Sequence, residues 1–185
     1  MRPLLVVVGP SGVGKSTIVK ELVSRNAIQL LPTWTTRPVR GDEDCAPEHV
    51  FCTEEELRDA LLDGRVLEVM PLFGLPYKYG LPRIEVADSG PVTVLMARAF
   101  LLPELDRHTQ NYMVYHIECE KSLVEKRLSI RSAGGAELGS RLDIFDHEVE
   151  LGRKVASRIF INNEPVHELI GQILKSLQTD FGLES

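Results

Sequence analysis

The chain has 185 residues, of which 43% are hydrophobic and 26% are charged, the composition of an ordinary globular protein. A chain of this length buries a large core on folding, so it needs neither a disulfide nor a structural metal to be stable. Its 21 Lys and Arg against 27 Asp and Glu give a net charge of −6, which argues against nonspecific binding to long nucleic acid and against a basic membrane-surface protein. We therefore expect one domain whose ligand is neither long nucleic acid nor a membrane surface.

The cysteines and the N-terminus favour a reducing compartment. Cys45, Cys52 and Cys119 form no CxxC pair, and their odd number fits a disulfide framework poorly. Cys45, His49 and Cys52 have a spacing that fits no zinc module. The apolar run at 4–8 is far too short for a membrane span and lacks a signal-peptide cleavage pattern. We expect a cytoplasmic protein.

Strand and helix patterns alternate along most of the chain. Short apolar, β-branched runs predict strands at 4–8, 28–35, 92–96, 113–117 and 159–161. Helical patterns are expected at 16–24, 53–63, 123–131, 140–156 and 166–177. Thr53 and Glu56 have the spacing of a capping box, and Gly64 is placed to end that helix. This alternation predicts an α/β fold in which helices flank a parallel sheet.

Three segments interrupt the alternation. The segments 38–47 and 72–82 are rich in Pro and Gly, and we interpret the stretch between them as a small inserted subdomain. The segment 132–139 consists mostly of small residues and lies between Arg131 and Arg141. Its composition and its flanking arginines favour a mobile lid.

A phosphate-binding loop is the strongest motif. Residues 9–16, GPSGVGKS, match G-x-x-x-x-G-K-[ST] between a predicted strand and a predicted helix. The glycines let the backbone wrap around an anion, and the helix N-terminus adds a favourable dipole. Lys15 is expected to reach the β- and γ-phosphates of ATP or GTP, the Ser16 hydroxyl to bind Mg²⁺, and Thr17 to approach the α-phosphate. The predicted nucleotide-binding residues of this segment are Gly9, Ser11, Gly12, Val13, Gly14, Lys15, Ser16 and Thr17.

The rest of the sequence favours a kinase among the proteins that carry this loop. No N-K-x-D guanine-specificity motif is present, and no apolar strand ends in Asp as a Walker B strand does. Both features count against a switch GTPase or a motor ATPase. A kinase also needs an acceptor site and cations that neutralise the transferring phosphoryl group.

The segments that follow the loop resemble guanylate kinases in order and spacing. They are TWTTRPVRGDE at 33–43, EHVFCTEEEL at 48–57, GRVLEV at 64–69, YKYG at 77–80, KRLSIR at 126–131 and IFINN at 159–163. The resemblance extends from Pro3 to about Ile173 and implies a P-loop fold with an acceptor-binding subdomain and a helical lid. The implied boundaries are a core of 1–32, 89–126 and 156–185, a subdomain of 33–88 and a lid of 127–155.

The same resemblance implies an acceptor site for a nucleoside monophosphate. Arg37 and Arg40 would present their guanidinium groups to the acceptor phosphate, which Tyr79 would also contact through its hydroxyl. Glu68 corresponds to the glutamate that accepts hydrogen bonds from the N1–H and amine of guanine. Thr33 falls where the family has a serine near the guanine carbonyl.

A catalytic set is also implied by the resemblance. Arg131 and Arg141 correspond to lid arginines that close over the ATP phosphates and, with Lys15, stabilise the charge of the transition state. Arg127 is a weaker member of this group. Asn162 lies where family members contact the adenine of ATP.

Three departures separate the chain from the guanylate kinase pattern. His49 takes the place of a tyrosine, which makes it a candidate acceptor ligand, and Leu81 takes the place of a hydroxyl residue. After the strand at 92–96, the Ile-Asp-x-Gln-Gly stretch of the family is missing and Arg98 lies nearby. The acidic group that helps to organise Mg²⁺ is therefore absent, and an extra arginine would suit an acceptor with an additional phosphate.

These departures leave several hypotheses open. His49, Ala97-Arg98-Ala99 and Leu102-Pro103 resemble ribose 1,5-bisphosphate phosphokinase, which makes phosphoribosyl diphosphate from ATP, whereas Glu68 keeps the guanylate kinase spacing. A non-catalytic guanylate kinase-like module that binds a protein is a second alternative, which the intact phosphate loop disfavours. A third is a P-loop kinase that acts on a nucleic-acid end or a specialised metabolite. The oligomeric state does not follow from the sequence.

Overall fold

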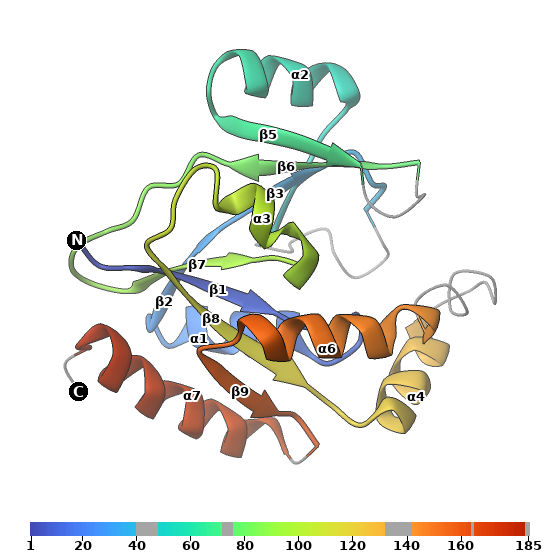
Figure 1. Ribbon diagram of the computed structural model, residues 1–185, viewed down its shortest axis with the longest axis vertical. Helices are drawn as coiled ribbons and strands as arrows, with labels where there is room; N and C mark the ends of the chain where they lie inside the picture. The colour runs from blue at the N-terminus through green and yellow to red at the C-terminus, as the bar shows by residue number, and fades with distance from the viewer. Residues whose placement is uncertain (40–47, 72–75, 132–141, 164, 184–185) are drawn as a thin grey trace.

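A five-stranded parallel sheet forms the centre of the molecule, in the order β2-β7-β1-β8-β9 (Figure 1). The structure, a computed structural model, describes residues 1–39, 48–71, 76–131, 142–163 and 165–183, with the side chains of all of these except 130 and 131. The strands of this sheet are β1 (Leu4–Val8), β2 (Ile28–Leu31), β7 (Val92–Met96), β8 (Tyr112–Glu118) and β9 (Arg158–Ile161). The predicted α/β fold with a parallel sheet is confirmed.

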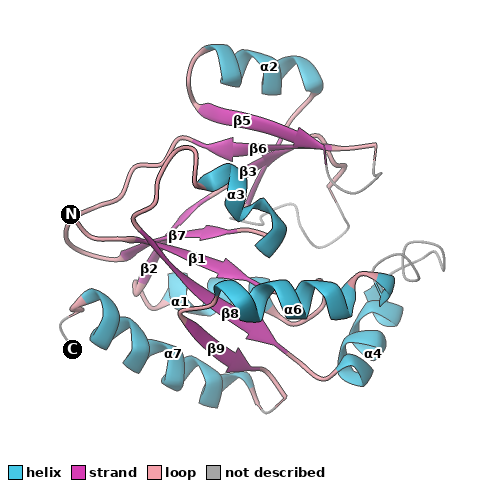
Figure 2. Cartoon of the chain, in the orientation of Figure 1, coloured by secondary structure: helices cyan, strands magenta, loops and turns pink. Residues whose placement is uncertain are grey.

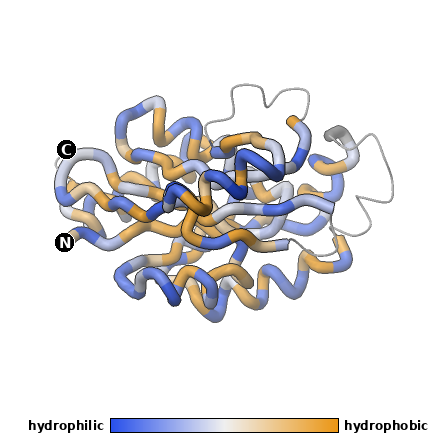
Figure 3. Tube along the Cα trace, turned by 90° about the horizontal axis from the view of Figure 1, so that it is seen from above, coloured by the Kyte–Doolittle hydropathy of each residue, from blue (hydrophilic) through white to orange (hydrophobic). Residues whose placement is uncertain are grey.

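Helices cover both faces of this sheet. The described helices are α1 (Lys15–Ser24), α2 (Glu54–Leu62), the short helix η1 (Ala99–Leu101), α3 (Leu102–Leu105), α4 (Lys121–Arg131), α6 (Phe145–Val155) and α7 (Val166–Phe181). All of these except α2, which packs on a second sheet, contribute to the apolar clusters of the central sheet. Alternate residues of β1 face opposite ways, as the two-residue period of a strand requires. Leu5 and Val7 pack in one apolar cluster with α1 and α7, whereas Leu4, Val6 and Val8 pack in another with η1 and α3. In Figure 3, hydrophobic segments gather in the middle of the molecule.

A second sheet of four strands lies beside the first, in the order β4-β3-β6-β5 (Figure 2). Its strands are β3 (Thr33–Thr35), β4 (His49–Phe51), β5 (Val66–Pro71) and β6 (Lys78–Pro82). β3 and β4 are parallel, while the β3–β6 and β5–β6 pairs are antiparallel. Helix α2 covers one face of this sheet through Leu57 and Ala60, which pack with Val66 and Trp34.

Two strand predictions are corrected by this arrangement. The segment 28–35, predicted as one strand, forms β2 in the central sheet and β3 in the second sheet. The division falls at Pro32, which has no N–H to donate and therefore interrupts a strand ladder. The segment 72–82, predicted as an interruption, contains β6. β4 and β5 were not predicted as strands, since each is short or only partly buried.

The helices agree more closely with their patterns. The Thr53–Glu56 capping box is confirmed, because the Glu56 N–H donates to Thr53 Oγ1 at 3.1 Å and the Thr53 N–H donates to Glu56 Oε2 at 2.7 Å. α6, at Phe145–Val155, lies within the helix predicted at 140–156, of which residues 140 and 141 are outside the described residues. In the part of the chain that the structure describes, no helix is both long and apolar enough to span a bilayer.

Candidate active site

The phosphate-binding loop has a backbone conformation that only glycine adopts easily. Gly9, Gly12 and Gly14 have φ angles of 147°, 85° and 95°. A Cβ atom at Gly9 would collide with the carbonyl of Ile117 in β8, and one at Gly14 would collide with the side-chain amide of Asn162. The loop therefore lies directly against the end of β8 and the segment after β9, and larger residues at these glycines would push it away.

Two predicted site residues hold this loop in place. Asn162 is buried, and its Nδ2 donates to the Val13 carbonyl at 2.7 Å. Arg127 of α4 donates through Nη2 to the Asn162 carbonyl at 3.4 Å and through Nη1 to Cys119 Sγ at 3.3 Å. Both residues thus contribute to the support of the loop, and the predicted contact between Asn162 and adenine stays a prediction.

Lys15, the first residue of α1, reaches back to the start of the loop. Its Nζ donates to the carbonyls of Gly9 at 2.6 Å and Pro10 at 2.8 Å. Burial, and to a smaller extent the neighbouring Arg98, lower the pKa of Lys15 to about 8, while Glu148 opposes this shift. Because two cations are held close together here, a polyanion is the ligand that this site favours electrostatically.

An acidic residue that the sequence analysis did not single out accompanies Arg98. The Nε of Arg98 donates to Oε1 of Glu148 at 2.5 Å, and the Glu148 side chain, on α6, is 3% exposed. The Arg98 guanidinium also lies over the Phe100 ring, with 5.7 Å from Cζ to the ring centroid. Helix α6 thus supplies a carboxylate close to the position where the family's acidic residue is missing. Its signal in the sequence is a glutamate spaced with Phe145 and Gly152 on the buried side of the helix.

Four of the predicted acceptor residues, namely Thr33, His49, Glu68 and Tyr79, lie on one face of the second sheet. Thr33 pairs with His49 across β3 and β4, and Thr35 pairs with Tyr79 across β3 and β6. Directly paired residues point to the same face. Glu68 pairs with Leu81, two residues beyond Tyr79 on β6, and therefore shares that face. Residues that the sequence separates by up to 46 positions are brought onto one surface, opposite the face that α2 covers.

Side-chain contacts join several of these residues. Thr33 Oγ1 and His49 Nδ1 lie 2.8 Å apart at hydrogen-bond distance, and the His49 and Tyr79 rings meet edge to face with their centroids 6.2 Å apart. Arg37 is only 6% exposed, and its Cζ lies 5.1 Å from the centre of the Phe51 ring. The structure therefore brings Thr33, Arg37, His49 and Tyr79 together.

Glu68 has partners that the sequence analysis missed. Arg107 Nη1 donates to Glu68 Oε1 at 2.9 Å, and His108 Nε2 lies 3.2 Å from Glu68 Oε2. Both partners follow α3 and are about 40 residues away in the chain, so no local pattern could have revealed them. Leu81, where the family has a hydroxyl residue, is buried and packs with Met70 in the core cluster of β1 and α3.

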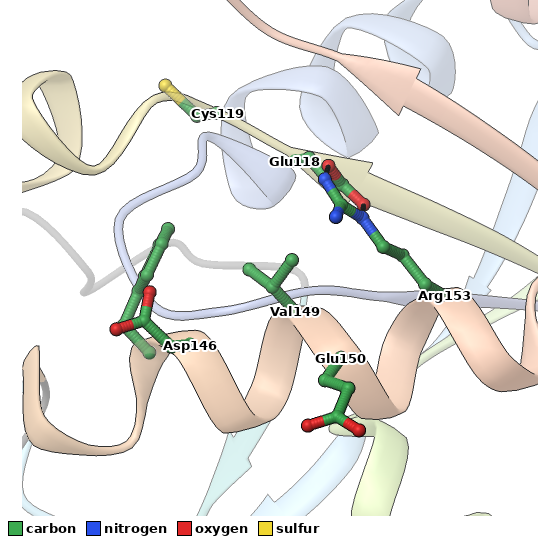
Figure 4. Close-up of a pocket in the computed structure, with 7 residues that line it drawn as sticks. Glu118, Cys119, Asp146, Val149, Glu150 and Arg153 are labelled. Atoms are coloured by element: carbon green, nitrogen blue, oxygen red, sulfur yellow. Dashed lines mark hydrogen bonds and ion pairs between the residues drawn. The ribbon is translucent and has the colours of Figure 1, made fainter.

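A cavity of about 400 Å³ lies beside the phosphate loop, between α6 and the end of β8 (Figure 4). Its lining contains none of the predicted site residues and consists of Glu118, Cys119, Phe145, Asp146, Val149, Glu150 and Arg153. Arg153 donates to both oxygens of Glu118 at 2.6 Å, which lowers the pKa of that carboxyl. His116 is fully buried beneath Gly152, and burial lowers the pKa of its ring.

The other predicted residues divide into two groups. Ser16 and Thr17 lie in the first turn of α1, where the helix N-terminus points toward the loop. Arg131 is the last residue of α4, and its side chain is outside the described part. Arg40, Arg141, Cys45 and the segment 132–139 also lie outside the described residues. Among the residues described, no group of three or more His, Cys, Asp or Glu side chains is placed to hold a metal ion.

A parallel sheet whose first strand runs through a glycine-rich loop into a helix defines a P-loop nucleotide-binding protein. No family model matches the chain. The guanylate kinase of Symbiobacterium thermophilum is 38% identical over 143 residues, which cover 75% of this chain and 67% of that protein. The guanylate kinase of Fusobacterium nucleatum is 30% identical over 171 residues, covering 87% and 88% respectively.

Longer alignments give the same result. The guanylate kinase of Prochlorococcus marinus subsp. pastoris is 26% identical over 183 residues, which are 97% of this chain and 98% of that protein. The crystal structure of guanylate kinase from Anaplasma phagocytophilum superimposes with a TM-score of 0.69 over 96% of this chain and 85% of that one, at 22% identity, and so shares the fold. The chain belongs to the guanylate kinase family and is a P-loop kinase.

Proposed function

We propose that the protein transfers the γ-phosphoryl group of ATP to GMP, with Mg²⁺ bound at Ser16. The observation that carries this proposal is the gathering of Thr33, His49, Tyr79 and Glu68 on one face of the second sheet, in a member of the guanylate kinase family. That face packs through Met70 and Leu81 against the core strands, whose β1 leads into the phosphate loop. Donor and acceptor sites would then share one side of the molecule.

The residues of the loop fit a nucleoside triphosphate. Cβ atoms at Gly9, Gly12 and Gly14 would collide with neighbouring protein atoms, so glycine is needed for the loop to keep its curved shape. The Lys15 ammonium lies at this loop, where it donates to the carbonyls of Gly9 and Pro10. Mg²⁺ takes oxygen ligands and in kinases binds largely through substrate phosphates and water, so the Ser16 hydroxyl is a sufficient protein contribution. When bound, Mg²⁺ would neutralise part of the phosphate charge.

The acceptor face offers groups that complement guanine and its phosphate. A carboxylate such as Glu68 accepts hydrogen bonds from the adjacent N1–H and 2-amino groups of guanine, whereas adenine offers no such pair of donors. Thr33, whose hydroxyl lies at hydrogen-bond distance from His49, would contact the guanine carbonyl. Arg37, with Arg40 and the Tyr79 hydroxyl, would bind the phosphate of GMP.

Transfer needs no nucleophilic side chain. An oxygen of the GMP phosphate attacks the γ-phosphorus while ADP leaves, and the protein contributes by alignment and by positive charge. Lys15 holds that charge at the loop, and Arg131 and Arg141 would add to it from the lid. Glu148 keeps the Arg98 guanidinium fixed next to Lys15, which limits the repulsion between the two cations.

A coupled assay of ADP release tests this proposal. The acceptors are GMP, dGMP, AMP, UMP and ribose 1,5-bisphosphate, each with Mg-ATP. We expect turnover with GMP and dGMP only. Turnover with the sugar bisphosphate alone would contradict the proposal and would place Arg98 at the acceptor, and absence of turnover with all five would contradict it as well.

A further inference from the structure

The Glu68 carboxylate is held on both sides by residues of the segment after α3. Oε1 accepts from Arg107 Nη1 at 2.9 Å, and Oε2 lies 3.2 Å from His108 Nε2. Arg107 is itself anchored to α3, because its Nη1 lies 2.7 Å from Oε2 of Glu104. A chain of polar contacts thus runs from α3, next to the core sheet, to β5 in the second sheet.

These contacts leave part of the carboxylate available. A carboxylate offers about four lone-pair positions, and Arg107 and His108 use one on each oxygen. The Glu68 side chain is 25% exposed, so its remaining positions are open to a ligand. Two contacts on different oxygens fix the plane of a carboxylate, which a single contact would leave free to rotate about its last bond.

A contribution to stability alone does not account for this arrangement. The Arg107 side chain is 65% exposed, and ion pairs of such exposure contribute about 0–1 kcal/mol to folding. Fixing the orientation of a group that recognises substrate has a larger effect, since the side chain no longer has to be ordered when the substrate binds.

We propose that Arg107 and His108 are positioning residues of the acceptor site, which orient the Glu68 carboxylate toward guanine. This inference rests on the proposed function, in which Glu68 accepts hydrogen bonds from the base. Arg107 and His108 act through Glu68, so they affect the binding and selection of the acceptor and leave the phosphoryl-transfer step unaltered. A segment of the core thereby takes part in the specificity of the second sheet.

Steady-state kinetics of the full chain test the inference with GMP and IMP as acceptors, since IMP lacks the 2-amino group of guanine. In Arg107→Ala and in His108→Ala we expect the KM for GMP to rise about tenfold, the effect of one hydrogen bond to a charged group. The kcat and the KM for ATP should stay those of the unaltered protein. The preference for GMP over IMP should decrease. A Glu68 carboxylate that rotates freely no longer aligns both oxygens with the N1–H and the 2-amino group of guanine, so the second donor contributes less.

Conservative and control variants separate this role from a structural one. Arg107→Lys keeps a cationic donor for the single contact with Oε1, and His108→Gln keeps a donor near the position of Nε2, so both should restore most of the affinity for GMP. Arg83→Ala is the matched control, because Arg83 is equally exposed at 65% and pairs with Glu85 away from Glu68. This control should leave all parameters unchanged.

Three results would overturn the inference, in distinguishable ways. In the first, the unaltered protein turns over GMP, and the variants keep the same KM for GMP and the same preference for GMP over IMP. Arg107 and His108 would then have no role in the acceptor site, while the proposed function stands. A lower KM for GMP in the variants would also overturn it, since the two residues would then compete with guanine for Glu68. Absence of GMP turnover in the unaltered protein would overturn both proposals.

Discussion

The two sheets of this protein differ in how their strands are buried. β1 of the central sheet is buried at every residue, and β7 at all but its last. β4 and β5 of the second sheet are mostly half-buried. A parallel sheet covered on both faces requires continuous apolar strands, whereas the second sheet has one face covered by α2 and another that carries polar groups. The polar face is the one that bears the candidate acceptor residues.

The phosphate loop and the candidate acceptor site differ in how widely their residues are spread along the chain. The phosphate loop consists of neighbouring residues at 9–16, whose shape depends on glycines within that segment. The acceptor site combines β3, β4, β5 and β6, and its Glu68 depends on Arg107 and His108 from the core. A local site tolerates changes elsewhere but fails when its own residues change, and a dispersed site shows smaller effects at more positions.

The largest effect is expected at Lys15. Lys15→Ala removes the cation at the loop and should lower kcat by about 10³-fold or more. The negative charge on the phosphoryl group in the transition state would then no longer be stabilised by the lysine ammonium. The ADP-release assay measures this change, and thermal unfolding serves as the control for folding. Unchanged turnover would remove the loop from the reaction.

Gly9→Ala should weaken nucleotide binding next most strongly. The new Cβ would collide with the Ile117 carbonyl, and the φ of 147° would strain the backbone as well. Together these cost about 3 kcal/mol, or about a hundredfold in affinity for ADP by calorimetry.

Gly90→Ala is the matched control for this variant. Gly90 also has a positive φ, of 79°, but a Cβ there would meet nothing within 4 Å. Its affinity for ADP should equal that of the unaltered protein. Equal losses of ADP affinity in the two variants would contradict the assignment of the effect to the collision between Gly9 and β8.

Nucleotide affinity should depend on pH through Lys15. The pKa of Lys15 is about 8 in the free protein. A bound polyphosphate favours the protonated amine and raises that pKa, so affinity stays constant below about pH 8 and falls by up to about tenfold per unit above it. Calorimetric titration with ADP from about pH 7 to pH 9.5 measures this dependence.

Two variants assign this pH dependence. Lys15→Arg should flatten it, because a guanidinium stays charged throughout the range. Glu148→Gln should move its midpoint to lower pH, since the Glu148 carboxylate raises the pKa of Lys15. A midpoint that does not move would mean that Glu148 has no influence on Lys15.

The smallest effect is expected in the second sheet, at the start of α2. Thr53→Ala removes the capping box and should lower the free energy of unfolding by about 1 kcal/mol, because the Glu56 N–H loses its acceptor. Thermal unfolding should shift by about 2–4 °C in a chain of this size, with ADP affinity unchanged. Thr53→Ser keeps the hydroxyl and should shift little. A loss of ADP affinity in Thr53→Ala would show that the two sheets are more tightly coupled than their separate apolar clusters indicate.

The sequence was most informative where the physical cause is local. The strand at 4–8, the loop at 9–16 and the capping box at Thr53 follow from adjacent residues, and the structure agrees with all three. The predicted strand at 28–35 was wrong in its length, since the position of Pro32 divides it between two sheets. Glu148 was missed because an acidic residue in an amphipathic helix is usually exposed, and its burial depends on how α6 packs.

By itself, the amino-acid sequence determined the α/β class, the phosphate loop and the resemblance to guanylate kinases, because apolar periodicity and glycine conformation act over a few residues. Only the tertiary structure decided which groups meet. It placed Thr33, His49, Tyr79 and Glu68 on one face, set Glu148 against Arg98, and joined Glu68 to Arg107 and His108. Such contacts depend on strand register and on the packing of distant segments, which local sequence patterns do not encode.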